Sequence, residues 1–293
     1  MKIVHTIAEM RAACAEARRG ERLGFVPTMG ALHQGHLSLV RAARARCDAV
    51  AVSIFVNPTQ FGPTEDFSKY PRTFERDCEM LEAEGVSLLF APSVEEMYPP
   101  GAVTFVTVEG LSEKLCGRSR PTHFRGVTTV VAKLFNIVQP DIAFFGQKDA
   151  AQAVIIKQMV RDLDLPVEIV VCPIVREADG LAMSSRNAYL DAAQRPSATV
   201  LHRALVQVQS QAEEGERGAG TLIEAAQRVF REEPAVRVDY VEIVDTETLD
   251  PLADVSGGAL VAVAAFVGAT RLIDNIVLPG TVLPQRHRGT ETT

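Results

Sequence analysis

The sequence predicts an α/β fold, with a Rossmann-like doubly wound parallel sheet followed by a smaller α+β C-terminal domain. Two observations carry this prediction. Short β-branched runs alternate with helical patterns over the first 175 residues, which is typical of a parallel sheet with helices on both faces. Beyond residue 176, two helical segments precede three strand-like segments without further alternation. We therefore expect one domain over residues 1–176 and a second over residues 177–293.

The elements of the first domain follow from apolar spacing. Leu23–Val26 is an apolar run that ends at Pro27, and the helix after it begins near Gly35. Val50–Val56 is nearly continuous and β-branched, which is typical of a strand buried on both faces. Phe74–Glu84 is charged with helical spacing, and Gly85 is a typical C-cap. The other expected elements are helix Leu37–Arg46, strand Val86–Phe90, helix Val127–Val138, strand Ile142–Phe145, helix Ala150–Leu163 and strand Val167–Cys172.

Two stretches depart from this alternation. Val103–Val108 alternates strictly between apolar and polar residues after a turn signal, and it predicts an edge or excursion strand. The second domain joins the first near Arg176–Arg186, and its last dozen residues, from about residue 281, are polar and expected to fray. Its expected elements are helices Pro196–Glu214 and Thr221–Glu232 and strands Val236–Val244, Leu260–Val267 and Thr270–Val277.

Composition narrows the class of protein. Of the 293 residues, 47% are hydrophobic and 23% are charged, so the chain can bury a core and is not disordered as a whole. A net charge of −7 argues against nucleic acid as a partner. The five cysteines form no CxxC pair, which favours free thiols in a cytoplasmic protein over a zinc site or a disulfide scaffold. The apolar run Ala259–Ala269 is too short to span a membrane.

The strongest chemical signal is the segment from Pro27 to His36, PTMGALHQGH, between a strand and a helix. Gly30 and Gly35 leave room for a phosphate to approach backbone N–H groups, and the helix start adds its positive dipole end. His33 and His36 are three residues apart, so they share a helix face. Isolated histidines are usually structural. Two imidazoles in this context instead indicate hydrogen-bond donors to a phosphorus transition state.

Three further segments follow strands in the same way. Asn57 and Gln60 come directly after Val50–Val56, where ligands bind in open parallel sheets. Their amides suit hydroxyl or carboxylate groups, although a simple Asn-Pro turn is an equally good explanation of this stretch alone. Tyr70 follows closely, as do Asp66, Lys69 and Arg72, and these side chains are expected to line the same mouth.

The third segment is Phe145-Gly146-Gln147-Lys148-Asp149, which ends a strand and opens a helix. Lys148 can offset phosphate charge, whereas Asp149 can accept from ribose hydroxyls or cap the helix. The fourth segment is Met183-Ser184-Ser185-Arg186, a loop whose hydroxyls and guanidinium suit a phosphate. Arg125, before the helix Val127–Val138, can reach a phosphate or carboxylate, but a surface role is equally consistent with its position.

The segment HxGH resembles the signature of the nucleotidyltransferase superfamily, whose members attack the α-phosphate of a nucleoside triphosphate. MSSRN resembles a variant of that superfamily's second signature loop. Together with FVNPTQF and the Gly-x-Lys-Asp loop, in this order from about residue 3 to 280, these motifs resemble the pantothenate synthetase (pantoate–β-alanine ligase) family. The resemblance implies ATP-dependent joining of (R)-pantoate to β-alanine, giving AMP and diphosphate, with Mg²⁺ and an enzyme-bound pantoyl adenylate. It also implies a homodimer.

The resemblance implies roles for the matched residues. His36 is the expected proton donor, and His33, Lys148, Ser184, Ser185 and Arg186 complete the catalytic set. Gln60 and Gln152 are expected to hold pantoate, with Asn57, Arg125 and Tyr70 as further substrate contacts, and Gln60 lies near the β-alanine site. We assign no protein ligand to the metal. The residues expected at ATP are Met29, Gly30, Ala31, Leu32, His33, Gln34, Gly35, His36, Gly146, Gln147, Lys148, Asp149, Val175, Met183, Ser184, Ser185 and Arg186.

Two alternatives compete with this interpretation. Another HxGH-type adenylyltransferase, acting on a phosphate-bearing substrate, requires a second cationic pocket for the acceptor phosphate. The stretch Asn57–Gln60 offers amides instead. A nucleotide-binding regulatory or RNA-binding module predicts loss of His36 or Lys148, or a basic stripe, and the sequence has neither feature. We also expect the second domain to act as a lid, hinged near Glu177–Leu181.

Overall fold

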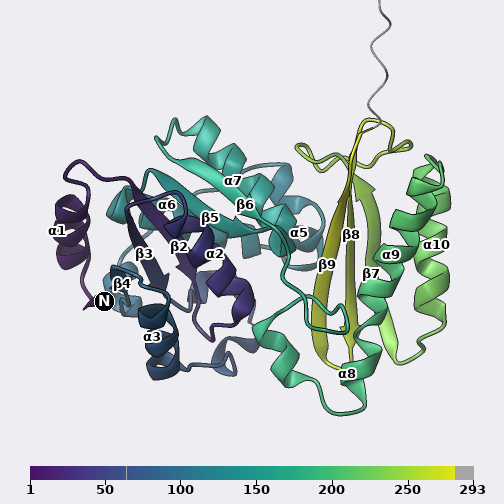
Figure 1. The fold of residues 1–293 in the computed structure, drawn as a ribbon, viewed down its shortest axis with the longest axis horizontal. Helices are drawn as coiled ribbons and strands as arrows, with labels where there is room; N and C mark the ends of the chain where they lie inside the picture. The colour runs from purple at the N-terminus through teal and green to yellow at the C-terminus, as the bar shows by residue number, and fades with distance from the viewer. Residues whose placement is uncertain (64, 281–293) are drawn as a thin grey trace, which may run out of the picture.

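The computed structural model describes residues 1–63 and 65–280. Its larger unit is a six-stranded parallel sheet with the strand order β1-β4-β3-β2-β5-β6 (Figure 1), so the predicted doubly wound sheet is confirmed. Strand β1 forms one edge of this sheet, where Lys2–Val4 pair in register with Leu88–Phe90. The strands are β1 (Lys2–Val4), β2 (Leu23–Thr28), β3 (Ala49–Ile54), β4 (Leu88–Phe90), β5 (Ile142–Gly146) and β6 (Glu168–Cys172).

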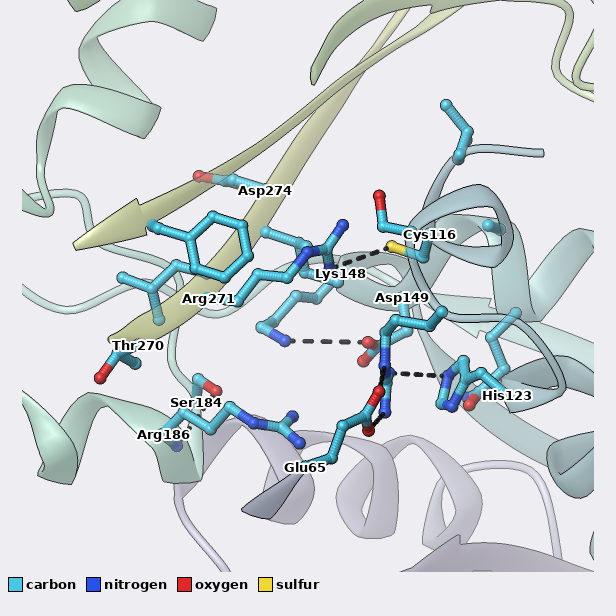
Figure 2. A pocket seen from close by; sticks show the side chains of 18 of the residues that line it. Glu65, Cys116, His123, Lys148, Asp149, Ser184, Arg186, Thr270, Arg271 and Asp274 are labelled. Atoms are coloured by element: carbon cyan, nitrogen blue, oxygen red, sulfur yellow. Dashed lines mark hydrogen bonds and ion pairs between the residues drawn. The ribbon is translucent and has the colours of Figure 1, made fainter. Parts of the chain in front are cut away.

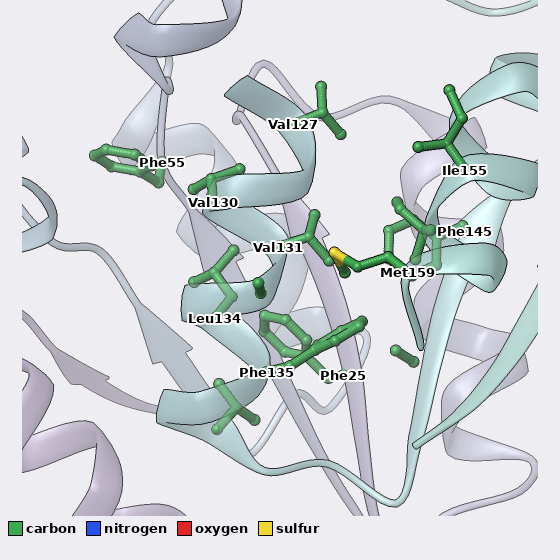
Figure 3. Close-up of a cluster of buried hydrophobic side chains, with 14 of the residues drawn as sticks. Phe25, Phe55, Val127, Val130, Val131, Leu134, Phe135, Phe145, Ile155 and Met159 are labelled. Atoms are coloured by element: carbon green, nitrogen blue, oxygen red, sulfur yellow. The ribbon is translucent and has the colours of Figure 1, made fainter. Parts of the chain in front are cut away.

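Consecutive residues of each central strand face opposite sides of the sheet, and both sides are buried. Phe25 packs on the side covered by α1 (Ile7–Ala17), α6 (His123–Val138) and α7 (Ala150–Asp162). Val26 packs on the other side, against α2 (Gln34–Arg44) and α3 (Phe74–Ala83). Figure 3 shows α6 contributing Val127, Val131 and Phe135 to the first cluster. Because both faces of these strands are buried, their sequences are continuous apolar runs.

The second unit is a three-stranded antiparallel sheet, β7 (Val236–Val244), β8 (Ala259–Val267) and β9 (Thr270–Leu278). Helices α9 (Val200–Glu213) and α10 (Ala219–Arg231) cover its outer face (Figure 1), and their apolar sides form one cluster with the sheet. The predicted α+β character is confirmed. The short helices α4 (Val94–Met97), α5 (Cys116–Ser119) and α8 (Gln194–Ser197) complete the α-helices of the described chain. The expectation for residues 281–293 lies outside the described residues.

The predicted strand at Val103–Val108 is wrong. The segment forms no strand. Its Val106 N–H donates to Thr129 Oγ1 at 2.9 Å, and its Val106 carbonyl accepts from Thr128 Oγ1 at 2.7 Å. Two threonines of α6 therefore replace the neighbouring strand that an alternating sequence usually pairs with. Helix α6 itself begins at His123, upstream of the predicted start at Val127.

The inner face of the small sheet packs against the first unit. Val244, Leu249, Leu260 and Ala262 belong to the same buried cluster as α6 and α7. Lys114, just before α5, donates to Asp250 at 2.7 Å across this interface. The two units therefore share a core. No helix in residues 1–63 or 65–280 is long and apolar enough to cross a membrane.

Candidate active site

The four predicted segments converge at the carboxyl edge of the parallel sheet, because they follow β2, β3, β5 and β6. Strand β2 pairs with β3 on one side and with β5 on the other, so the strand order reverses between β2 and β5. Ligands of open α/β sheets bind at such a switch point. Two adjoining cavities of about 790 and 230 Å³ lie there. Residues that line both are Arg120, His123, Lys148, Asp149, Gln152, Ser184 and Arg186.

His33 and His36 lie side by side at the start of α2, with ring centroids 4.1 Å apart. The Gly35 N–H donates to His33 Nδ1 at 3.1 Å, and the His33 N–H donates to His36 Nδ1 at 3.3 Å. Each Nδ1 is thus an acceptor, so in the neutral ring the proton sits on Nε2. Both rings line the smaller cavity. The backbone therefore selects the tautomer that can donate from Nε2.

Burial sets the charge state of these rings. It lowers the pKa of His33 to about 4, with the positive charge of Lys148 adding to the effect. It lowers the pKa of His36 to about 3, with His33 and Lys148 as further causes. Both imidazoles are therefore neutral at pH 7 and act as hydrogen-bond donors there. Gly35 permits this packing, because a Cβ at that position would lie 2.8 Å from His33 Cε1.

Asp77 on α3 holds the loop before these histidines, and sequence reasoning missed it. Asp77 is 1% exposed, and its carboxylate accepts from the N–H groups of Ala31 and Leu32 at 2.8 and 2.9 Å. The N–H of Gly30 donates to Thr28 Oγ1. The expectation that these backbone groups are free to receive a phosphate is thus corrected. Among the predicted ATP residues, Gly30, Ala31, Leu32, Gln34 and Gln147 do not line either cavity.

Asn57 orients the side chain of Gln60 through a network of hydrogen bonds. Asn57 is 1% exposed, and its Nδ2 donates to Gln60 Oε1 at 3.0 Å and to the Gly126 carbonyl at 3.1 Å. Its Oδ1 accepts from the Tyr98 hydroxyl at 2.9 Å. The amide of Asn57 is therefore fully engaged within the protein. It orients Gln60, whose Nε2 donates to Met29 Sδ at 3.1 Å at the wall of the smaller cavity.

The smaller cavity combines an apolar wall with amides. Gln60 and Gln152 face it from two elements, and Tyr70, which is 6% exposed, lines it as well. Burial raises the pKa of Tyr70, so its hydroxyl stays protonated. Val175 and Met183 also line the cavity, beside Gly146. Its apolar wall includes Val127, Val130, Val131 and Leu134 of α6 together with Phe55.

Cationic groups enter the larger cavity from separate segments, and Figure 2 shows Lys148, Arg186 and Arg271 around it. Lys148 Nζ lies 3.8 Å from the Asp149 carboxylate. The Arg186 guanidinium donates to both oxygens of Asp66, at 3.0 and 3.1 Å. Ser185 Oγ donates to the Ala31 carbonyl at 3.1 Å, whereas Ser184 Oγ accepts from the Arg186 N–H. This part of the site suits a polyphosphate.

Arg125 lies outside both cavities, contrary to the expectation. Its guanidinium stacks over the Phe105 ring, 3.7 Å from the centroid, at an exposed position. Two neighbours occupy the site instead. Arg120 donates to Glu65 at 2.8 Å, and His123 Nδ1–H donates to the Gln60 carbonyl at 2.8 Å. Burial and the Arg120 charge lower the pKa of His123 to about 4. In the sequence, the two basic residues Arg120 and His123 were the signal that could have placed these side chains at the site.

Comparison with known proteins agrees with this geometry. The model of the family described as pantoate-beta-alanine ligase matches residues 2–277. The chain belongs to the pantoate-beta-alanine ligase family. The pantothenate synthetase of Koribacter versatilis is 62% identical over 95% of this chain and 96% of its own. That of Acidobacterium capsulatum is 62% identical over 96% of this chain and 98% of its own.

Solved structures of pantoate-beta-alanine ligases share the fold. A pantothenate synthetase from Thermus thermophilus superposes with a TM-score of 0.91 at 50% identity, covering 94% of this chain and 99% of that one. A Francisella tularensis pantoate-beta-alanine ligase, complexed with beta-gamma ATP and beta-alanine, has a TM-score of 0.80 at 33% identity, covering 94% and 97%. The chain is therefore an enzyme that ligates pantoate to β-alanine, and the adenylyltransferase alternative is not favoured.

Proposed function

We propose that this ligation consumes ATP and proceeds through an enzyme-bound pantoyl adenylate, releasing AMP and diphosphate. The observation that carries the proposal is the junction of the two cavities at Lys148 and Gln152. A compartment of amides and apolar side chains there meets a compartment of cationic side chains. A small hydroxy acid in the first thus lies beside a polyphosphate in the second.

In the first step, a carboxylate oxygen of pantoate attacks the α-phosphorus, and the bond from phosphorus to the diphosphate oxygen breaks. Gln60 and Gln152 hold the pantoate hydroxyls and carboxylate beside the apolar wall of α6. Negative charge grows on the α-phosphate and the leaving diphosphate. Lys148, Arg186 and the hydroxyls of Ser184 and Ser185 offset it, since preorganised donors in a water-poor site are the largest source of such stabilisation.

The two neutral histidines contribute hydrogen bonds to the same charge. With each Nδ1 occupied by a backbone N–H, the Nε2–H groups of His33 and His36 are the donors left for a phosphate oxygen. At pKa values of about 4 and 3, neither ring carries a proton to transfer as a cationic acid near pH 7. We therefore assign His36 the role of donor to the transition state rather than that of imidazolium.

In the second step, the neutral amine of β-alanine attacks the acyl carbon of the adenylate. The acyl C–O bond breaks, the oxygen stays with AMP, and the amine proton passes to solvent. Arg120 and His123 lie beside both cavities, and Gln60 is adjacent to them through its carbonyl. The Arg120 guanidinium fits the carboxylate of β-alanine, whereas His123 accepts from Arg120 through Nε2 and donates to Gln60 through Nδ1. Exclusion of water protects the adenylate from hydrolysis.

Mg²⁺ is part of the proposal as the counter-ion of ATP. It binds chiefly to phosphate oxygens and water, with one or two protein carboxylates, and Asp66 and Asp149 are carboxylates that line the larger cavity. When bound, the ion neutralises phosphate charge. We also propose a cytoplasmic location, because all five cysteines are free thiols, as is typical of reducing compartments.

We further propose two domains, residues 1–176 and 177–293, with the second acting as a lid hinged near Glu177–Leu181. The chain passes from the first unit to the second through this segment, and this passage supports a hinge there. A homodimer completes the proposal. Val103 and Phe105, 81% and 43% exposed, are apolar side chains that a second copy can cover.

The function is tested by incubating the protein with ATP, Mg²⁺, (R)-pantoate and β-alanine and measuring AMP and pantothenate. We expect AMP and pantothenate in equal amounts. We expect no AMP when pantoate is omitted, because pantoate supplies the attacking oxygen. Without β-alanine, we expect about one equivalent of diphosphate per site and no AMP, because AMP leaves only when the amine attacks the adenylate. AMP release that is indifferent to pantoate, or release of ADP, would contradict the proposal.

A further inference from the structure

Asn275 on β9 reaches from the small sheet to the turn that carries Lys148. Its side chain is buried, with 3% of the residue exposed. Nδ2 donates to the Gln147 carbonyl at 2.9 Å and to the Lys148 carbonyl at 3.0 Å. Gln147 Nε2 donates to Asn275 Oδ1 at 3.2 Å. One amide thus makes three hydrogen bonds to a single turn of the other sheet's unit.

The chemistry of this contact requires asparagine. Backbone carbonyls only accept hydrogen bonds, so the two donors of the amide nitrogen must face Gln147 and Lys148, and the oxygen must face the Gln147 side chain. A carboxylate of the same shape would place negative charge against two carbonyl oxygens. An apolar side chain would leave those partly buried carbonyls without this donor, which is costly.

The strand holds Asn275 in place. Residue 275 pairs in register with Ala262 of β8. The preceding residue, Asp274, is 2% exposed and accepts from the Arg176 guanidinium at 2.6 and 3.0 Å. Two consecutive residues of β9 therefore tie the small sheet to the chain at both Arg176 and the Gln147–Asp149 turn. An amide on such a rigid element can define the position of the turn.

We propose that Asn275 is a positioning residue for ATP binding: it holds the Gln147–Asp149 turn in the conformation that presents Lys148 to the nucleotide phosphates. The inference rests on the proposed role of Lys148 in binding ATP. It makes the affinity for nucleotide depend on the docking of the small sheet. In the pantoate compartment, Gln60 lies on η1 (Pro58–Gln60) and packs against α6, which Asn275 does not contact through these bonds. Gln152 lies on α7 and not in the turn itself.

The test compares full-length Asn275→Ala and Asn275→Asp with the unmodified protein in steady-state kinetics. We expect the KM for ATP to rise roughly tenfold, the scale of one lost buried hydrogen bond, while the KM for pantoate changes less than about twofold. Should the alanine variant fail to fold, Asn275→Ser, which keeps one hydroxyl donor, takes its place. Unfolding temperatures measured in parallel identify the folded variants.

A pH series separates positioning from a merely structural role. The carboxyl of Asn275→Asp regains one O–H donor when it is protonated, and its shape matches the amide. We expect its KM for ATP, divided by that of Asn275→Ala, to fall as the pH is lowered from about 8 to about 5.5, towards the range in which a buried carboxyl takes up its proton. A role confined to stability would leave this ratio unchanged.

Arg118→Ala is the matched control, because Arg118 pairs with Glu242 across the same interface without contacting the turn. It should keep the KM for ATP within about twofold. The inference is overturned if the Asn275 variants keep a normal KM for ATP or if Arg118→Ala reproduces their effect. It is also overturned if the KM values for ATP and for pantoate rise by the same factor. An unmodified protein that releases no AMP with ATP, Mg²⁺, pantoate and β-alanine together would instead refute the proposed function.

Discussion

At the scale of single residues, the site works through neutral donors and paired cations. His33 and His36 have their Nδ1 atoms fixed by backbone N–H groups, so each presents Nε2–H to the smaller cavity. Arg186 and Arg120 are each held by a carboxylate, Asp66 and Glu65. Phosphate oxygens must therefore compete with these carboxylates, which keeps the cationic groups ordered before the nucleotide arrives.

Substitution of His36 tests the neutral-donor role. His36→Ala should lower kcat by about 10²–10³, the scale for loss of one preorganised donor. His36→Gln places an amide N–H near the position of Nε2, so it should retain clearly more activity than the alanine variant. Steady-state rates near neutral pH measure both. Equal losses in the two variants would mean that the imidazole acts by something other than hydrogen-bond donation.

The depressed histidine pKa values also predict how stability depends on pH. In the unfolded chain these rings take up protons near pH 6.5, whereas in the folded protein His33 and His123 do so near 4 and His36 near 3. Between these limits the unfolded state binds more protons, so stability falls as the pH falls from about 6.5 towards 4.

At pH 5 the loss should be about 1–2 kcal/mol for each of these histidines. Denaturant unfolding at pH 7 and pH 5 measures it. His123→Gln serves as the comparison, because it removes one of the three titrating rings and should reduce the loss. A free energy of unfolding that does not change between pH 7 and pH 5 would refute the assigned protonation states.

At the scale of elements, close packing of α6 against η1 shapes the pantoate compartment. Gly126 permits the approach, because a Cβ there would lie 2.3 Å from the Thr59 carbonyl oxygen and 2.6 Å from the Gln60 nitrogen. Asn57 then bonds the Gly126 carbonyl and Gln60 together. The position of Gln60 thus depends on Gly126, which lines neither cavity.

Gly126→Ala tests this packing. The added methyl should separate α6 from η1, reduce stability by about 1–3 kcal/mol as overpacking does, and raise the KM for pantoate more than the KM for ATP. Kinetics and thermal unfolding measure the two effects. Gly220→Ala in α10, where a Cβ meets nothing within 4 Å, is the control and should leave both KM values unchanged. A normal KM for pantoate in Gly126→Ala would contradict the assignment.

Sequence patterns predicted most elements, because double-sided burial makes parallel strands apolar throughout. They failed where the structure of a segment depends on its hydrogen-bond partner, because the sequence pattern does not identify that partner. Val103–Val108 alternates like a strand, yet its backbone bonds to two threonines of α6. Strand β1 has three residues, too few for a periodic signal. Its neighbour α1 does carry a signal, since Thr6 and Glu9 form a capping box.

For the site, too, local sequence patterns predicted some residues and missed those that depend on tertiary contacts. Motifs identified the chemistry-bearing side chains that follow each strand. They did not identify Asp77, Arg120 or Asn275, since these residues lie far away in the sequence and reach the site only through tertiary contacts. Arg125 was placed at the site from its position before α6, but the helix begins at His123 and turns that side chain out onto Phe105.

At the scale of the whole molecule, a shared core links the two sheets. Leu260 and Ala262 of β8 pack in the same cluster as α6 and α7, and Arg176 of the connecting segment forms an ion pair with the buried Asp274 of β9. The net charge of −7 is compatible with anionic substrates, because Arg120, Lys148, Arg186 and Arg271 gather around one cavity.

The shared core predicts cooperative unfolding. Scanning calorimetry should give a single transition, because loss of the small sheet exposes part of the first core. ATP should shift that transition upward, as a ligand bound only to the folded state does. Two well-separated transitions, with only one moved by ATP, would show that the sheets unfold independently.

A pantoyl adenylate requires that an oxygen atom pass from pantoate to AMP, and isotope labelling measures this transfer directly. (R)-Pantoate carrying ¹⁸O in both carboxylate positions is incubated with the protein, ATP, Mg²⁺ and β-alanine, and AMP is analysed by mass spectrometry. We expect one ¹⁸O atom in the phosphoryl group of each AMP and one in the amide carbonyl of the product. Unlabelled AMP formed along with product would contradict the pantoyl adenylate.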